Sequence, residues 1–229
     1  MTQSPLNLPQ IKICGLTRLD QAMAAAELGA DAIGFVFFKK SPRNLSMAAA
    51  RAMAEALPAH VARVGVFVNE SFDHIMAHVT EVGLTAVQLH GRETPDLVKR
   101  LLAERITVIK GFYLEDPPLI TEAPLYEASA ALVECKKGIL PGGNAMTWSW
   151  GEAKPFGKAH PLILAGGLGP ENVGEAILQA DPDAVDVSSG VESAPGQKDI
   201  SKINLFIERV KETRREEIPD RRILRRIFS

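Results

Sequence analysis

The feature that most constrains the fold is the even recurrence of short apolar runs rich in β-branched and aromatic residues. Most of these runs are followed by a segment with the apolar spacing of a helix. The runs are almost continuously hydrophobic instead of alternating, which is typical of parallel strands covered by helices on both faces. The eight expected strands are Ile11–Cys14, Ala32–Phe37, Ala62–Phe67, Ala86–Leu89, Thr107–Gly111, Ala131–Glu134, Leu162–Ala165 and Ala184–Val187.

The segments between the runs predict helices with one apolar face, because Ala, Leu, Met, Ile or Val recur at spacings of three and four. Side-chain oxygens at the expected starts can bond the unpaired N–H groups of the first turn: Thr17 with Asp20, Ser46, and Thr94 before Pro95. The expected helices are 18–28, 46–57, 71–81, 94–104, 171–179 and 199–210.

The fifth and sixth helices are expected to be irregular. The segment 115–130 contains three prolines, and the short segment 151–160 contains Pro155. Proline lacks the N–H group that a helix interior needs, so only partial or distorted helices are expected in these two places.

Strict alternation of strand and helix predicts an α/β protein with a parallel sheet, either closed into a barrel or open and doubly wound. Periodicity does not distinguish the two. The glycine-rich loops do, because they follow the seventh and eighth strands and not the first, which is the barrel arrangement. We therefore expect a single (β/α)8 TIM barrel over residues 1–210, and the length of 229 residues suits it.

A charged C-terminal extension, residues 211–229, lies beyond the eighth expected helix. It carries seven basic and four acidic residues. We interpret it as a solvated tail or a helix extension. The alternative is an interaction segment that docks the apolar side chains of Ile223, Leu224, Ile227 and Phe228.

Composition favours a small-molecule partner in the cytoplasm. The net charge of −2 gives no general attraction for nucleic acid. Two cysteines, Cys14 and Cys135, cannot form a multi-bridge framework, which fits a reducing compartment. Residues 1–10 do not have the pattern of a signal peptide, and no apolar stretch approaches the length of a membrane span. The oligomeric state, monomer or homodimer, is left open.

Two glycine loops predict a phosphate site. AGGLGPEN at 165–172 leads into a helix whose first N–H groups are unpaired, and DVSSG at 186–190 adds a second turn with two hydroxyls. Either loop alone would usually be only a turn. After strands seven and eight together, their backbone amides can surround a phosphate. The expected phosphate ligands are Gly166, Gly167, Ser188, Ser189 and Gly190.

A thiol and a carboxyl group are the candidate catalytic groups. Cys14 stands at the mouth of the first strand, where a tunable thiol can act as a general base. Glu134 ends the sixth strand, where partial removal from water would raise the pKa of its carboxyl group. Without the barrel context, Cys14 would more often be a small buried hydrophobe and Glu134 a solvated edge charge.

Several motifs in order resemble the phosphoribosylanthranilate isomerase family of tryptophan biosynthesis, from about Ile11 to Val210. KICGLT and the DVSSGVE…PGQKD pattern are the most specific. The full set is KICGLT at 12–17, GFVFFKKSPRNLS at 34–46, VGVFVN at 64–69, VQLHG at 87–91, ILAGGLGPENV at 163–173 and DAVDVSSGVESAPGQKD at 183–199.

The resemblance implies an aldose–ketose isomerase that converts N-(5'-phosphoribosyl)anthranilate to 1-(2-carboxyphenylamino)-1-deoxyribulose 5-phosphate by an Amadori rearrangement, without cofactor or metal. It implies that Cys14 abstracts the C2' proton and that Glu134 protonates the ring oxygen. It further implies that Arg43 pairs with the anthranilate carboxylate, and that the pocket is lined by Gln88, His90 and Asp186.

The sequence departs from the family pattern around the implied acid. Glu134 stands where the family has Asp, and GGNAMTWSW at 142–150 replaces the usual loop pattern. Cys135 or one of Lys136 and Lys137 could share the site. Two alternatives therefore stay open: an isomerase for a different phosphosugar, and a non-catalytic barrel that binds phosphosugars.

Overall fold

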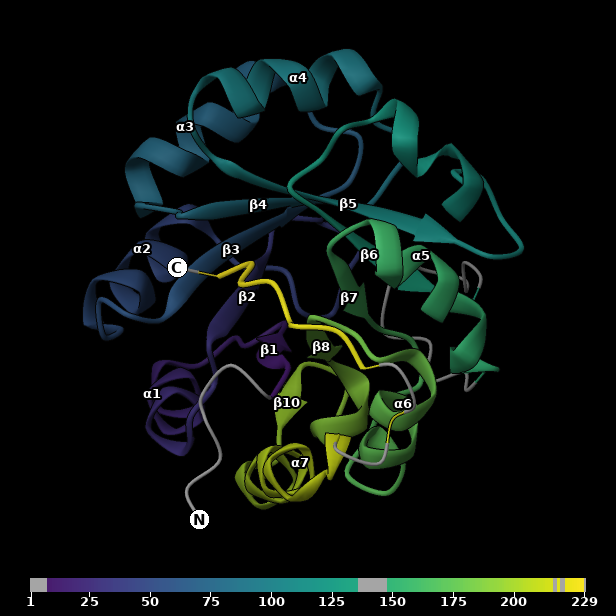
Figure 1. Ribbon diagram of the computed structural model, residues 1–229. Coiled ribbons are helices and arrows are strands. Elements are labelled where there is room, and N and C mark those ends of the chain that lie inside the picture. Colours follow the sequence, from purple (N-terminus) through teal and green to yellow (C-terminus); the bar gives the residue numbers. More distant parts are fainter. Residues whose placement is uncertain (1–7, 136–147, 216–217, 219–220, 229) are drawn as a thin grey trace.

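The central feature of the fold is a closed barrel of parallel strands. The computed structural model describes residues 8–135, 148–215, 218 and 221–228. Within these residues, eight strands pair in chain order, and β1 pairs with β8 (Figure 1). The expected barrel is confirmed and the open sheet is excluded. The strands are β1 (Gln10–Cys14), β2 (Ala32–Val36), β3 (Ala62–Phe67), β4 (Ala86–Leu89), β5 (Thr107–Tyr113), β6 (Ala130–Glu134), β7 (Leu162–Leu164) and β8 (Ala184–Val187).

Helices surround the barrel (Figure 1). Their apolar faces are buried, as the spacing predicts. In α7, for example, the buried positions are Ile203, Phe206, Ile207 and Val210. In the part of the chain described, no helix has the length and apolar character needed to cross a membrane. The main helices are α1 (Leu19–Leu28), α2 (Met47–Ala56), α3 (Phe72–Val82), α4 (Pro95–Ala103), α6 (Val173–Ala180) and α7 (Ile200–Glu212).

Two of the three expected helix caps are confirmed. The hydroxyls of Ser46 and Thr94 each accept a hydrogen bond from a backbone N–H in the first turn of α2 and α4. The expected cap at Thr17 is wrong, because α1 begins after Arg18 and has no side-chain cap. The Thr17 hydroxyl instead donates to the Gly196 carbonyl at 2.9 Å. A tertiary contact thus replaces the local one.

The irregular fifth and sixth helices are confirmed. After β5 the chain forms only the 3-10 helix η2 (Ile120–Leu125), which contains Pro124. After β6 it forms η3 (Trp150–Ala153) and the short α5 (Lys154–Ala159). Between β8 and α7 lies an unexpected insertion made of η4 (Ser189–Val191) and the hairpin β9 (Glu192–Ala194) and β10 (Gln197–Lys198).

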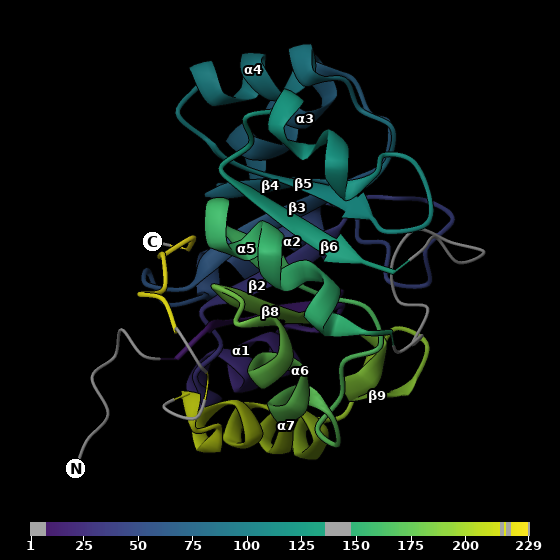
Figure 2. The same cartoon turned by 45° about the vertical axis from the view of Figure 1, so that its right-hand side comes forward.

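The C-terminal extension packs against the barrel, so its interpretation as a solvated tail is wrong for the described part. Leu224, Ile227 and Phe228 are buried, whereas Ile223 is 84% exposed. Ile227 and Phe228 join an apolar cluster with alanines at the starts of strands, among them Ala32, Ala62, Ala86, Ala130 and Ala184. Residues 221–228 therefore cover the end of the barrel opposite β9, and we call this segment the floor (Figure 2).

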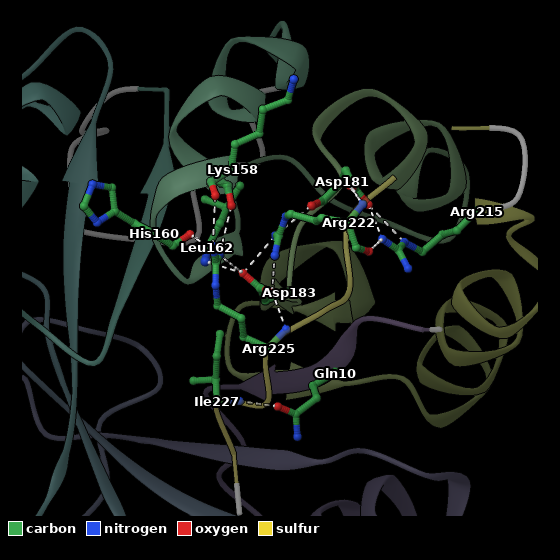
Figure 3. A network of polar contacts seen from close by, with 11 residues as sticks. Gln10, Lys158, His160, Leu162, Asp181, Asp183, Arg215, Arg222, Arg225 and Ile227 are labelled. Carbon is green, nitrogen blue, oxygen red and sulfur yellow. Dashed lines mark hydrogen bonds and ion pairs between the residues drawn. The ribbon is translucent and has the colours of Figure 1, made fainter. Parts of the chain in front are cut away.

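Ion pairs and backbone contacts hold this floor in place (Figure 3). Asp183, which is fully buried, pairs with Arg222 and Arg225, and Asp181 pairs with the buried Arg215. Such buried carboxylates need partners because an unpaired buried charge is costly.

The floor is also bonded to the first strand. The Gln10 amide nitrogen donates to the Phe228 carbonyl at 2.8 Å, and its oxygen accepts from the Ile227 N–H at 2.7 Å. The two ends of the described chain are thereby joined.

Candidate active site

One pocket at the carboxyl ends of the strands brings the expected site residues together. The empty space within it is about 690 Å³, which includes space open to solvent. Of the expected residues, only Gly190 does not line it. Those that do are Cys14, Arg43, Gln88, His90, Glu134, Gly166, Gly167, Asp186, Ser188 and Ser189.

Cys14 shares its face of β1 with Lys12, because side chains two residues apart on a strand point the same way. The Lys12 ammonium lies 2.9 Å from a carboxylate oxygen of Asp186 on β8, and its side chain is fully buried. Gly34 on β2 makes the necessary space: a Cβ there would lie 2.8 Å from the Cys14 sulfur and 3.2 Å from the Lys12 nitrogen.

Opposing charges act on the thiol. Burial raises the pKa of Cys14 above its ordinary value, the ammonium of Lys12 acts to lower it, and Asp186 adds to the rise. Burial alone would lower the pKa of Lys12, but Asp186, joined by Cys14, raises it. Lys12 therefore stays charged and is placed to stabilise a thiolate at Cys14.

Glu134 lies at the end of β6 and is only 8% exposed. Burial, with a further contribution from Asp186, raises the pKa of its carboxyl group to about 8. Its carboxylate oxygen lies 3.9 Å from Nε2 of His90, and the other ring nitrogen of His90 lies 3.2 Å from the amide nitrogen of Gln88. Near neutral pH, Glu134 can therefore donate a proton into the pocket.

The two glycine loops meet beside this acid. Gly166 and Gly167 both have positive φ, a conformation that glycine adopts without strain. Asn172 braces their loop by accepting from the Gly169 N–H and donating to the Gly167 carbonyl, both at 2.8 Å. In the second loop, the Ser188 hydroxyl donates to the Cys14 carbonyl at 3.1 Å, which ties that loop to β1.

Gly190 has a different position from the one expected. It lies outside the pocket lining, and a Cβ there would be 1.9 Å from the carbonyl oxygen of Leu168. The absence of a side chain at Gly190 therefore lets the two loops approach each other closely.

Arg43 reaches the pocket from the loop after β2, and its guanidinium forms a paired contact with Glu192. Its Nε and Nη2 each donate to one carboxylate oxygen of Glu192 at 2.7 Å. The Lys198 ammonium donates to the same carboxylate at 2.8 Å and to the Ser188 carbonyl at 2.9 Å. Glu192 and Lys198 lie within the DVSSGVE…PGQKD motif, but neither was predicted as a site residue.

The structure describes only some of the residues that follow Glu134 in the chain. The Trp148 indole donates to the Ala165 carbonyl at 3.1 Å and packs over the first glycine loop, where Gly166 leaves room for it. Cys135 does not line the pocket, and its thiol lies 3.6 Å from a carboxylate oxygen of Glu115. Lys136, Lys137 and residues 142–147 of the atypical loop lie outside the described residues.

Comparison with known proteins agrees with this geometry. Residues 11–209 match the family model for N-(5'-phosphoribosyl)anthranilate (PRA) isomerase. The N-(5'-phosphoribosyl)anthranilate isomerase of Desulfatibacillum aliphaticivorans is 48% identical over 204 residues, covering 89% of this chain and 94% of the relative.

Solved structures that are similar to this chain carry the same family name. Phosphoribosyl anthranilate isomerase from Thermotoga maritima superposes with a TM-score of 0.82 at 43% identity, covering 89% of this chain and 99% of the other. A phosphoribosyl anthranilate isomerase in complex with reduced 1-(o-carboxyphenylamino)-1-deoxyribulose 5-phosphate superposes with a TM-score of 0.79 at 42% identity and the same coverage. From its barrel, its rim pocket and these matches, the chain belongs to the N-(5'-phosphoribosyl)anthranilate isomerase family.

Proposed function

We propose that this chain catalyses the Amadori rearrangement of N-(5'-phosphoribosyl)anthranilate in tryptophan biosynthesis. The observation that carries the proposal is that Cys14 and Glu134 line one pocket, in which the pKa of Glu134 is raised to about 8. This pairs a candidate base with a carboxyl group that holds its proton near neutral pH. A solved family member in complex with a reduced product analogue supports the choice of substrate.

Ring opening comes first in the proposed reaction. Glu134 gives its proton to the ribose ring oxygen as the bond from that oxygen to C1' breaks. The lone pair of the anthranilate nitrogen forms the C=N bond of a protonated Schiff base. The departing oxygen thus leaves as a hydroxyl, which is why a protonated carboxyl group suits this position.

Proton abstraction follows. The Cys14 thiolate removes the C2' proton, and the electrons of that bond move toward the Schiff base to give an enaminol. Return of a proton to C1' and loss of one from the enol hydroxyl then give the aminoketose, so substrate and product have the same composition. Lys12, held by Asp186, stabilises the thiolate form.

Binding groups surround the reacting atoms in this proposal. Backbone amides around Gly166, Gly167 and Ser189 receive the phosphate, helped by the hydroxyl groups of the second loop. Arg43 receives the anthranilate carboxylate, for which a planar fork of donors is suited. Gln88 and His90 line the middle of the pocket.

The reaction is assigned to the cytoplasm. Cys14 and Cys135 are not joined by a disulfide, as a reducing compartment favours. A base whose thiol must ionise also gains from protection against oxidation.

The first prediction tests the thiol. When substrate is mixed with the protein, its anthranilate fluorescence should decay. Cys14→Ala or Cys14→Ser should slow the decay at least about a hundredfold, because general-base catalysis typically contributes that much or more. Cys135→Ser is the matched control, since Cys135 does not line the pocket, and it should keep the wild-type rate.

Other outcomes would redirect the proposal. No decay with wild-type protein, together with turnover of another phosphosugar in a substrate panel, would indicate a different isomerase. Turnover that appears only in Glu134→Asp would indicate a binding barrel that has lost its acid. Rescue of a tryptophan auxotroph lacking this isomerase would support the reaction in a cell.

A further inference from the structure

We propose that Glu192 is a positioning residue, which holds the Arg43 guanidinium so that its outer edge receives the carboxylate of the substrate's aryl group. This inference rests on the proposed function and deepens it, because it names the group that makes the site selective for a carboxylated amine.

The geometry of the Arg43–Glu192 pair carries the proposal. The carboxylate binds the guanidinium side-on, through Nε and Nη2, with both contacts at 2.7 Å. A guanidinium has five N–H groups in fixed directions. A side-on pair uses two of them and leaves three, of which one on Nη1 and one on Nη2 lie on the outer edge and form a second fork for a carboxylate.

We infer that the second fork faces the pocket, because only one member of the pair lines it. Arg43 lines the pocket, whereas Glu192 does not. The two side chains are only 11% and 5% exposed, so water competes little for their contact. Among the described residues, the Arg43 guanidinium hydrogen-bonds to Glu192 alone.

Glu192 is itself fixed from two sides. Lys198 donates to its carboxylate at 2.8 Å, and Lys202 of α7 donates to its backbone carbonyl, also at 2.8 Å. Burial alone would raise the pKa of Glu192, but Arg43 and Lys198 lower it, so the carboxylate stays ionised.

Gly15 completes the arrangement of the arginine. A Cβ at position 15 would lie 2.4 Å from Cδ of Arg43, so the arginine stem passes over a residue that has no side chain. Gly15 also has a φ of 76°, which glycine adopts without strain.

The charges distinguish two possible roles of Glu192: positioning the Arg43 guanidinium, or changing the electrostatic attraction of the substrate carboxylate. The Arg43 and Glu192 side chains together carry no net charge, and burial lowers the pKa of the neighbouring Lys198. Glu192→Gln would raise that net charge, so attraction alone predicts tighter binding. Positioning predicts the reverse, because the glutamine side chain presents an NH2 group to one of the two arginine donors and breaks the fork.

The test compares two substrates that differ only in the carboxylate: the phosphoribosyl adducts of anthranilate and of aniline. We expect Glu192→Gln to raise KM for the anthranilate adduct about tenfold with a much smaller change in kcat, as for loss of one charged hydrogen bond. The kcat/KM ratio of the anthranilate adduct to the aniline adduct should fall by the same factor. In an Arg43→Ala background, Glu192→Gln should leave this ratio unchanged.

Three results would overturn the inference: an equal rise in KM for both adducts, tighter binding of the anthranilate adduct, or an undiminished effect in the Arg43→Ala background. Binding of the reduced product analogue, with and without its carboxylate, makes the same comparison without turnover. Failure of the proposed reaction is therefore distinguishable from failure of the positioning role. If Glu192→Gln does not fold, Glu192→Asp keeps the charge but shortens the reach, and the same fall in the substrate ratio is expected.

Discussion

At the scale of single residues, the proposed chemistry depends on which of two side chains, Cys14 or Glu134, carries a proton. The proposed reaction needs the proton on Glu134 and none on Cys14. In the free protein the pKa of Glu134 is about 8, and burial raises the pKa of Cys14 above its ordinary value. The thiol therefore holds its proton more tightly than the acid does. With one proton on the two groups, the productive arrangement is therefore the less populated one.

This ionisation predicts the pH dependence of kcat/KM. The singly protonated pair forms as pH rises toward about 8, where Glu134 titrates, and is lost at higher pH, where Cys14 titrates. We therefore expect kcat/KM to increase between about pH 6 and 8 and to decline only at more alkaline pH. Initial rates from fluorescence decay across this range measure the profile. A rate that is flat below pH 8 and falls through pH 8 would contradict it.

The sequence predicted site residues that, apart from Gly190, line one pocket, but it did not predict their partners. Cys14 and Glu134 could be selected because the ends of parallel strands converge on one rim. The Lys12–Asp186 and Arg43–Glu192 pairs join residues more than a hundred positions apart in the chain. Pairing at that distance depends on the barrel register and the β9–β10 hairpin, neither of which local patterns specify.

At the scale of elements, the periodicity predicted the eight strands, with their bounds shifted by at most two residues. The end of β5 shows why the bounds differ: Phe112 and Tyr113 extend it beyond Gly111 because they pair with Val133 and Glu134 of β6. Prolines correctly predicted the irregular helices after β5 and β6. The hairpin β9–β10 escaped prediction because its strands of three and two residues are too short to show alternation.

The contact between the two glycine loops leads to a prediction about the phosphate site. In Gly190→Ala the new Cβ would meet the Leu168 carbonyl at 1.9 Å, so one loop must move. We expect KM for the phosphorylated substrate to rise by about tenfold or more, and inhibition by inorganic phosphate to weaken in parallel. Gly151→Ala is the control, since the nearest atom that its Cβ would meet among the described residues is the Gln179 carbonyl oxygen, at 3.9 Å. Wild-type affinity for phosphate in Gly190→Ala would show that the spacing of the loops does not matter.

At the scale of the whole molecule, the β9 end of the barrel and the floor are opposite each other (Figure 2). The floor carries paired charges around Asp183 and an apolar tip at Phe228, which is 2% exposed. Composition drew attention to the basic residues of the extension and predicted solvation. Their acidic partners, Asp181 and Asp183, lie just before β8. The pairing of these charges is therefore visible only in the folded chain.

Removing the tip of the floor should destabilise the protein without altering its chemistry. We expect Phe228→Ala to lower the free energy of unfolding by about 3–5 kcal/mol, as for other buried aromatic residues, and to lower Tm by on the order of ten degrees. The exposed Ile223 provides the control, and Ile223→Ala should change stability by less than about 0.5 kcal/mol. Thermal and denaturant unfolding measure both. Equal stability of the two variants would show that Phe228 does not fill the floor.

The floor also sets an order of events during synthesis. Ile227 and Phe228 follow all eight strands in the chain. A ribosome therefore releases every strand of the barrel before it releases these two residues. Until then the ring of alanines at the strand starts faces water. A nascent chain halted after α7 would therefore bind hydrophobic dyes or chaperones at that ring, and would release them once Ile227 and Phe228 emerge.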